Sequence, residues 1–288
     1  MPFSAEVITD SINPSNQRVT TFLVTYPRFI HGEFMTHRVF SRNSASSRAI
    51  PIIKVINQVL AEPAMPVAWG KNGKGMQSQE YFEGEDRNIC EQAWKEAARS
   101  AVESAKKLLD LGLHKQIANR VLEPFMWMTV LVTSTDWSNF FSLRVHKAAQ
   151  PEFQYLSHMM LGKYLISRPV FKNWGEWHVP FSDKMPEGLD ESTRKKIATA
   201  RAARTSYLTI DGPIDTQKDI LLHDSLALEG HWSPFEHTCQ AFDGPVKGNF
   251  NGWKQYRHEF PNENRVCDLD KLWDSTHESK EIFGCWRK

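Results

Sequence analysis

Hydrophobic and polar positions along the first half of the chain alternate between strand-like and helix-like spacing. Residues 18–26 are β-branched and aromatic, which predicts a strand. Apolar residues then recur at helical spacing over residues 27–37, and Pro51 opens a second short apolar helix. Residues 86–111 carry one apolar face, so we predict the longest helix there, with Gly112 as its stop signal.

The next apolar run leaves two interpretations open. Residues 127–135 fit either a buried strand or a fully apolar turn of helix, and periodicity does not separate the two. Asp136 is a candidate cap for a helix that ends at Arg144. A longer helix is expected from Pro151 to about Ile166.

One candidate boundary divides the chain. Residues 167–190 are rich in Pro, Gly and Trp, which is typical of a connection. It would join a body of about residues 1–166 to a C-terminal segment of about residues 191–288. That segment opens with two predicted helices, at 191–204 and 217–229, followed by a turn and a strand.

Composition and charge narrow the class of protein. The 288 residues are 41% hydrophobic and 24% charged, as in a globular protein of one large or two ordinary domains. Thirty-five basic and 34 acidic residues give a net charge of +1, which argues against a partner that is polymeric nucleic acid. Any affinity for phosphate is therefore expected to be local, as in a pocket for a small ligand.

Targeting signals and cysteine spacing point to the cytoplasm. The first residues lack the basic and apolar regions of a secretory signal, and no apolar stretch reaches the roughly 18–20 residues that span a bilayer. No CxxC pair occurs among the four cysteines, so neither a metal site nor a disulfide framework is expected. They are Cys90, Cys239, Cys267 and Cys285.

Basic and hydroxyl side chains are concentrated in one short run, residues 37–48. It holds three arginines, one histidine, one asparagine and four serines without an acid, and we expect it to form a loop or tight turn. Guanidinium forks and hydroxyls are the groups that bind phosphate oxygens. The run is therefore either a phosphate or nucleotide site or a solvated basic loop.

Residues 231–237, His-Trp-Ser-Pro-Phe-Glu-His, form a second cluster. Its spacing does not suit a metal site, because adjacent Glu and His point in different directions on a strand. It fits a general acid/base pair, a turn that holds a ligand, or a turn whose side chains only satisfy local backbone groups.

Two further arginines, Arg144 and Arg120, fit either a purely structural role or a role in ligand binding. Arg144 stands near the end of a predicted helix, where a cation is favoured in any case. Arg120 lies beside an apolar run and is either a surface arginine or an inward anion clamp. Neither GxGxxG nor GxxxxGK[ST] occurs, so a Rossmann or P-loop phosphate site is not expected.

Together these segments resemble the flavin-dependent thymidylate synthases. That family carries Arg-His-Arg followed at fixed spacing by Ser, Asn-Glu, Ser and Arg, and this chain matches it at His37, Arg38, Ser41, Asn43, Ser46 and Arg48. Its Ala-Ala-Arg-x-Ser-Tyr, His-x-[Ser/Thr]-Pro-Phe-Glu-His and Asn-Phe-x-x-x-Leu-Arg elements resemble residues 202–207, 231–237 and 139–152. The chain looks most like divergent phage and bacterial members, so a phage-encoded protein would act in the host cytoplasm.

The resemblance implies an α+β fold, an antiparallel sheet flanked by helices, with residues 1–288 as a single catalytic domain. It implies methylation of dUMP to dTMP with FAD, NADPH and methylenetetrahydrofolate in a homotetramer, without a cysteine nucleophile or a metal. The positions that match flavin contacts are His37, Arg38, Asn43, Asn139, His231, Ser233 and Glu236. The positions that match nucleotide contacts are Ser46, Arg48, Arg120 and Arg144. Arg144 would activate the pyrimidine ring, and His231 would position flavin and folate beside it.

Several departures from the family pattern bear on the substrate. The elements at 202–207 and 231–237 follow the basic run instead of preceding it, so the chain looks circularly permuted. Thr36 replaces the first arginine, Ser44 a glutamate and Glu33 a glutamine. We hypothesise that Arg257 supplies the guanidinium lost at Thr36. The competing functions are a pyrimidine-nucleotide hydroxymethylase on the same fold and a non-catalytic flavin- or nucleotide-binding subunit.

Overall fold

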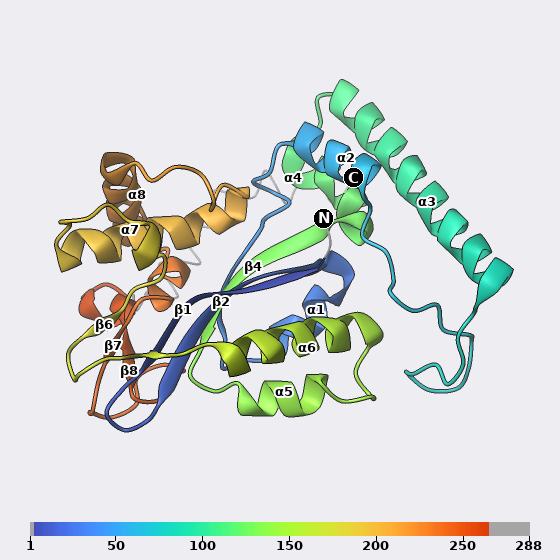
Figure 1. Ribbon diagram of the computed structural model, residues 1–288. Coiled ribbons are helices and arrows are strands. Elements are labelled where there is room, and N and C mark those ends of the chain that lie inside the picture. The colour runs from blue at the N-terminus through green and yellow to red at the C-terminus, as the bar shows by residue number, and fades with distance from the viewer. Residues whose placement is uncertain (1–2, 265–288) are drawn as a thin grey trace, which may run out of the picture.

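The computed structural model describes residues 3–264 and shows a main sheet of five strands flanked by helices (Figure 1). The strand order is β3-β4-β2-β1-β5, and all neighbours are antiparallel except the two-residue β1–β5 pair. The strands are β1 (Ser4–Ile12), β2 (Arg18–Pro27), β3 (Ser41–Ser44), β4 (Trp127–Ser134) and β5 (Val170–Phe171). The predicted α+β class, with an antiparallel sheet between helices, is confirmed.

The two central strands pair along their whole length, and hydrophobic clusters cover both of their faces. β2 and β4 are in register from Thr20 opposite Ser134 to Pro27 opposite Trp127. Phe22 and Val24 face one hydrophobic cluster, whereas Leu131 faces a second cluster on the other side of the sheet. The apolar run at 127–135, which periodicity left undecided, is therefore a strand.

Most body helices cover the first face of the sheet. α5 and α6 lie on this side, opposite α7 and α8, and α3 extends past the end of the sheet (Figure 1). The predicted longest helix is confirmed as α3, which packs through Ala98, Val102 and Ala105 and ends before Gly112. The body helices are α1 (His31–Met35), α2 (Ile52–Ala61), α3 (Gly84–Asp110), α4 (Lys115–Ala118), α5 (Ser138–Arg144) and α6 (Pro151–Ile166).

The segment after α6 covers the second face of the sheet. Within the described residues it contributes two helices and a three-stranded sheet of order β6-β7-β8. Trp177 of β6 and the buried side chains of α7 pack with Leu131 of the main sheet, whereas β7 and β8 pack with Val19 in a smaller cluster. These elements are β6 (Trp177–His178), α7 (Glu191–Arg204), α8 (Thr216–Glu229), β7 (Cys239–Ala241) and β8 (Trp253–Gln255). The helices predicted at 191–204 and 217–229 are confirmed.

Between residues 3 and 264, short 3-10 helices join these elements at six places. Two of them flank residues that matter below, one after β2 and one in the cluster at 231–237. They are η1 (Arg28–Ile30), η2 (Asn119–Phe125), η3 (Ser182–Lys184), η4 (Thr205–Tyr207), η5 (Ser233–Glu236) and η6 (Tyr256–Glu259).

One expectation about the basic run is wrong. Residues 41–44 were expected in a loop but form β3, an edge strand paired with β4 from Ser41 opposite Thr133 to Ser44 opposite Val130. Small polar residues have little intrinsic preference for a strand, so β3 depends on the backbone groups that the edge of β4 offers. Asp136 does act at the start of α5, where its Oδ1 accepts from the Ser138 backbone N–H.

Residues 265–288, which include Cys267, Cys285 and the end of the predicted C-terminal segment, lie outside the described residues. Across residues 3–264, none of the helices is both long and apolar enough to cross a membrane.

Leu131→Ala should destabilise the protein by about 2–5 kcal/mol, because the fully buried side chain joins the sheet to the C-terminal cluster and its removal leaves a cavity. Urea unfolding followed by circular dichroism measures the change. Leu165→Ala is the matched control, since Leu165 is 70% exposed and its loss should cost less than about 0.5 kcal/mol. Equal effects of the two variants would contradict this account of the core.

Candidate functional site

The basic run and the cluster at 231–237, far apart in the sequence, lie side by side. β3 contacts η5, and His237 Nε2 lies 3.0 Å from Asn43 Oδ1 across 194 residues of sequence. A second hydrogen bond joins β8 to β3, because Gln255 Nε2 donates to Ser41 Oγ at 2.9 Å. The predicted halves of the site are therefore joined by buried hydrogen bonds.

A groove of about 960 Å³ opens where the two halves meet. Arg204, Tyr207, His114 and Lys115 lie on its walls. Its volume is in the range of pockets for cofactors and other small molecules. Five residues predicted from the sequence line this groove, namely Asn43, Ser46, Arg48, His231 and Ser233.

Arg144 and His37 form a separate pair at the end of α5. Arg144 Nε donates to His37 Nε2 at 2.9 Å, and its Nη2 donates to Thr36 Oγ1 at 3.3 Å. The guanidinium also stacks on Phe153, with Cζ 4.7 Å from the ring centroid. The guanidinium that lies beside Thr36 is thus that of Arg144.

Burial, together with the cations of Arg144 and Arg42, lowers the pKa of His37 to about 4. The imidazole is therefore neutral near pH 7, which leaves Nε2 free to accept the hydrogen bond from Arg144. Burial also lowers the pKa of Arg144, and the Glu33 carboxylate opposes that shift. A neutral acceptor thus orients Arg144 without cancelling its charge.

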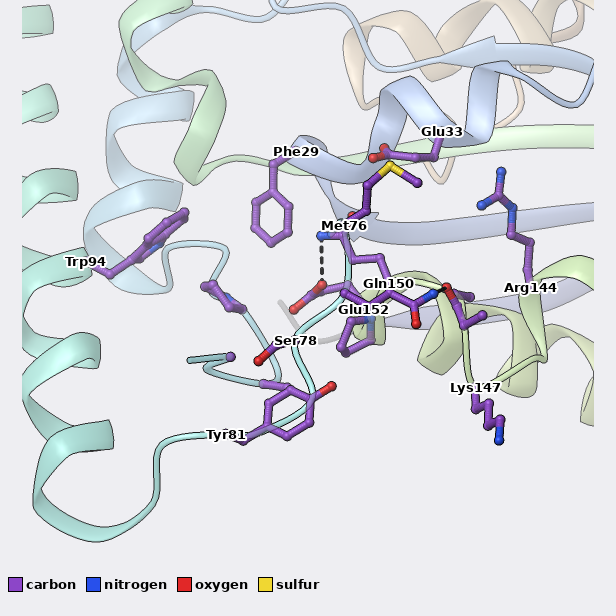
Figure 2. Close-up of a pocket in the computed structure, with 17 residues that line it drawn as sticks. Phe29, Glu33, Met76, Ser78, Tyr81, Trp94, Arg144, Lys147, Gln150 and Glu152 are labelled. Carbon is purple, nitrogen blue, oxygen red and sulfur yellow. Dashed lines mark hydrogen bonds between the residues drawn. The ribbon is translucent and has the colours of Figure 1, made fainter. Parts of the chain in front are cut away.

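Arg144 projects into a second hollow, of about 600 Å³. Phe29 and Trp94 lie on one side of it, and Arg144 and Lys147 lie on the other (Figure 2). Glu33 also lines the hollow, so the pocket combines aromatic surface with separate acidic and basic groups.

Arg48 and Arg120 share a small hollow of about 230 Å³ with Ser46 and a third arginine, Arg28. Glu123 holds this cluster, because its Oε1 accepts from Arg28 Nη2 at 2.9 Å and from Arg120 Nη1 at 2.8 Å. Sequence reasoning missed Arg28 and Glu123. The one signal in the sequence was the position of Arg28, a basic residue just after the predicted strand at 18–26.

These hollows adjoin one another along the protein surface. Ser46 and Arg48 line both the large groove and the small hollow. Arg28 and Arg120 then line a further hollow of about 420 Å³, which shares Phe29 with the hollow of Arg144. A continuous belt of cavities therefore leads from His231 to Arg144.

The remaining predicted residues lie off this belt. Arg38 and Asn139 are exposed and line none of the hollows described above. Glu236 is half-buried and is bound through Oε1 by Arg257 Nη1, while Arg257 Nε lies 3.2 Å from Glu263 Oε2. Arg257 is thus held by two carboxylates rather than by Thr36, and its proposed compensating role stays a prediction.

The sequence profile of a family described as thymidylate synthase complementing protein matches residues 12–165. Two curated relatives are named flavin-dependent thymidylate synthase, from Tropheryma whipplei strains TW08/27 and Twist. Each is 29% identical over 140 residues, which is 47% of this chain and 56% or 55% of the relative. The matched region thus spans a little over half the length of these relatives.

Among solved structures, the chain is similar to a UMP/dUMP methylase, PolB from Streptomyces cacaoi, bound with 5-Br dUMP or with 5-Br UMP. The two structures have TM-scores of 0.46 and identities of 19% and 20%. Each similarity covers 57% of this chain, and 90% or 88% of the other chain.

Arg144→Gln should raise the pKa of His37 part of the way from about 4 toward 6.5, because one of the cations that lower it is removed while burial and Arg42 remain. NMR titration of the imidazole measures the shift. In the wild type, His37 is protonated at a higher pH in the unfolded chain than in the folded protein. Titration of His37 should therefore lower the free energy of unfolding as pH falls from about 6.5 to about 4. Arg38→Gln is the control, and an equal shift in it would contradict the assignment to Arg144.

Proposed function

The chain belongs to the thymidylate synthase complementing protein family, and we propose that it methylates dUMP to dTMP in a flavin-dependent reaction. The observation that carries the proposal is the contact between β3 and η5. It places Asn43, Ser46 and Arg48 in one groove with His231 and Ser233. Two relatives with the name flavin-dependent thymidylate synthase support the same reaction.

The groove fits an FAD cofactor in size and in chemistry. It offers the amide of Asn43, the hydroxyl of Ser233 and the imidazole of His231, and the last two are exposed to it. Such groups hydrogen-bond ring carbonyls, ring nitrogens and ribose. FAD would supply hydride transfer, with NADPH as its reductant and methylenetetrahydrofolate as the carbon donor.

The arginine-lined hollow suits the phosphate of a nucleotide. Arg48 and Arg120 are exposed, Ser46 adds a hydroxyl, and Arg28 adds a third guanidinium that Glu123 holds in place. Guanidinium groups bind phosphate oxygens through two parallel hydrogen bonds. We therefore propose Ser46, Arg48 and Arg120 as phosphate ligands, with Arg28 beside them.

Arg144 is proposed to act on the pyrimidine ring. Its Nη1 makes no hydrogen bond within the described part of the chain, and its position is fixed by His37, Thr36 and the Phe153 ring. A fixed cation stabilises negative charge that develops on a ring as a carbon or hydride adds. The neutral His37 positions this cation and takes up no proton itself.

A homotetramer would bring the groove and the Arg144 hollow together. Within one chain they lie at opposite ends of the belt of cavities, and a second copy could complete each site. Exposed Met35, Val39 and Leu143 surround His37 and Arg144 in sequence and would be covered by such a contact.

Cysteine chemistry is not part of the proposed mechanism. Cys239 is buried, which raises the pKa of its thiol well above the ordinary value, and Cys90 is a partly exposed residue of α3. Neither thiol lines the groove or the Arg144 hollow. A cysteine nucleophile from residues 3–264 is therefore not required.

Mass spectrometry of the product tests the function directly. Purified protein is incubated with dUMP or dCMP, methylenetetrahydrofolate and NADPH, and its flavin absorbance is recorded first. We expect bound flavin and a methyl gain on dUMP. A hydroxymethyl gain would instead identify the competing hydroxymethylase, and a protein without flavin or product would support a non-catalytic subunit.

Arg144→Gln should lower kcat by about 10²–10³-fold, because a positioned donor to the developing charge is lost. FAD content should stay close to that of the wild type, since Arg144 lines a different hollow. Arg87→Gln is the control, as Arg87 lies on the exposed side of α3 and pairs with Glu91. An unchanged kcat in Arg144→Gln would remove this residue from the mechanism.

Arg257→Ala separates two roles for Arg257. If Arg257 replaces the guanidinium missing at Thr36, nucleotide affinity falls strongly and FAD content is nearly unchanged. Its ion pair with Glu236 supports the other outcome, a roughly tenfold weaker binding of FAD with nucleotide affinity retained. Binding of dUMP and FAD, each measured by titration calorimetry, distinguishes the two, and no change in either would exclude both roles.

A further inference from the structure

A buried chain of polar side chains crosses the main sheet beneath the C-terminal segment. It runs from Asn43 Oδ1 to His237 Nε2 at 3.0 Å, and from His237 Nδ1 to Thr133 Oγ1 at 2.8 Å. Thr133 meets Thr21 Oγ1 at 2.7 Å, and Thr21 meets His178 Nε2 at 2.9 Å. The last link joins His178 Nδ1 to Ser11 Oγ at 2.9 Å.

Every member of this chain is removed from water. Ser11, Thr21, Thr133 and His178 have no exposed surface, His237 is 1% exposed, and Asn43 is 7% exposed. Burial lowers the pKa of both histidines to about 3, with a smaller contribution from Lys172 at His178 and from His178 at His237. Each imidazole is therefore neutral, with one nitrogen that donates and one that accepts.

The direction of each hydrogen bond follows from the end at Asn43. A carbonyl oxygen only accepts, so His237 must donate from Nε2 and accept at Nδ1 from the Thr133 hydroxyl. Thr133 has then used its proton and accepts from Thr21, which in turn accepts from His178 Nε2. The same logic makes Ser11 the donor to His178 Nδ1.

We propose that His237 and His178, through Thr133 and Thr21, are positioning residues that fix the amide of Asn43 so that its Nδ2–H₂ donor faces the groove. Asn43 lines the groove, and its Nδ2 has no hydrogen-bond partner among the described residues. The group opposite must therefore be an acceptor. On an isoalloxazine this is a ring carbonyl or an unprotonated ring nitrogen, and this identification rests on the proposed flavin-dependent function.

A reversed amide would reverse the whole chain. If Asn43 turned its Nδ2 toward His237, that histidine would have to accept at Nε2 and donate from Nδ1, and His178 would follow. The two arrangements thus differ in the tautomer of two histidines. A hydrogen-bond chain that is satisfied at every link keeps one arrangement, because a single reversed member would leave two donors or two acceptors facing each other.

The tautomers provide a test that needs neither cofactor nor activity. Long-range ¹H–¹⁵N NMR of the imidazoles at pH 7 should show His178 and His237 both protonated at Nε2. His231, exposed on the groove, provides a solvent-averaged reference signal. Protonation at Nδ1 in His237 would mean that Asn43 presents its carbonyl to the groove, and the proposal would be overturned.

Thr133→Val breaks the chain without touching the groove. Valine has nearly the same shape but lacks the hydroxyl that donates to His237 Nδ1. Asn43 should then lose its fixed orientation, and FAD should bind about three- to tenfold more weakly. Thr129→Val is the matched control, because Thr129 lies on the same face of β4 and pairs with Thr25 outside the chain. FAD affinity is measured by fluorescence quenching, and equal affinities in the two variants would overturn the positioning role.

The redox potential separates positioning from general loss of structure. A donor aimed at the ring stabilises the electron-rich reduced flavin more than the oxidised form, so Thr133→Val should have a lower flavin midpoint potential than Thr129→Val. If the wild-type protein binds no FAD, the proposed function fails, whereas the NMR result still decides the direction of the hydrogen bonds. If FAD binds and the potentials of the two variants are equal, the positioning role alone fails.

Discussion

The structure depends on how one polar face of the main sheet is covered. Thr21 lies opposite Thr133, and Thr25 lies opposite Thr129, with a leucine pair between them. Burying hydroxyls without partners costs free energy, so this face cannot be closed by apolar side chains alone. The segment after α6 supplies His178 and His237 at the required positions. Its placement on the sheet is therefore fixed by hydrogen bonds as well as by hydrophobic packing.

That placement explains how two motifs far apart in the sequence assemble one groove. The basic run and the cluster at 231–237 need not be close in the sequence. β3 brings the basic run to the groove at the edge of the main sheet, and η5 contacts β3 there. The same sheet carries Arg144 at the end of α5 on its other side. The order of the motifs along the chain thus matters less than the face of the main sheet on which each motif lies.

Local patterns in the sequence predicted much of this, and long-range contacts account for what they missed. β2, the two helices of the C-terminal segment and α3 were predictable because propensity, periodicity and stop signals act within a few residues. β3 was not, since only the edge of β4 makes Ser41–Ser44 a strand. His178 stands in no motif, and the low pKa of His37 results from burial and from Arg144, 107 residues away.

The hydrogen bonds of β3 have a consequence for how the family's motif can change. Ser41 and Asn43 of this strand are buried and hydrogen-bonded to Gln255 and His237. Asn43 also lines the groove, so the same side chain serves the packing of the sheet and the contact with a ligand. A residue that replaced Asn43 would therefore have to suit His237 and the ligand together, which links ligand preference to the stability of the sheet edge.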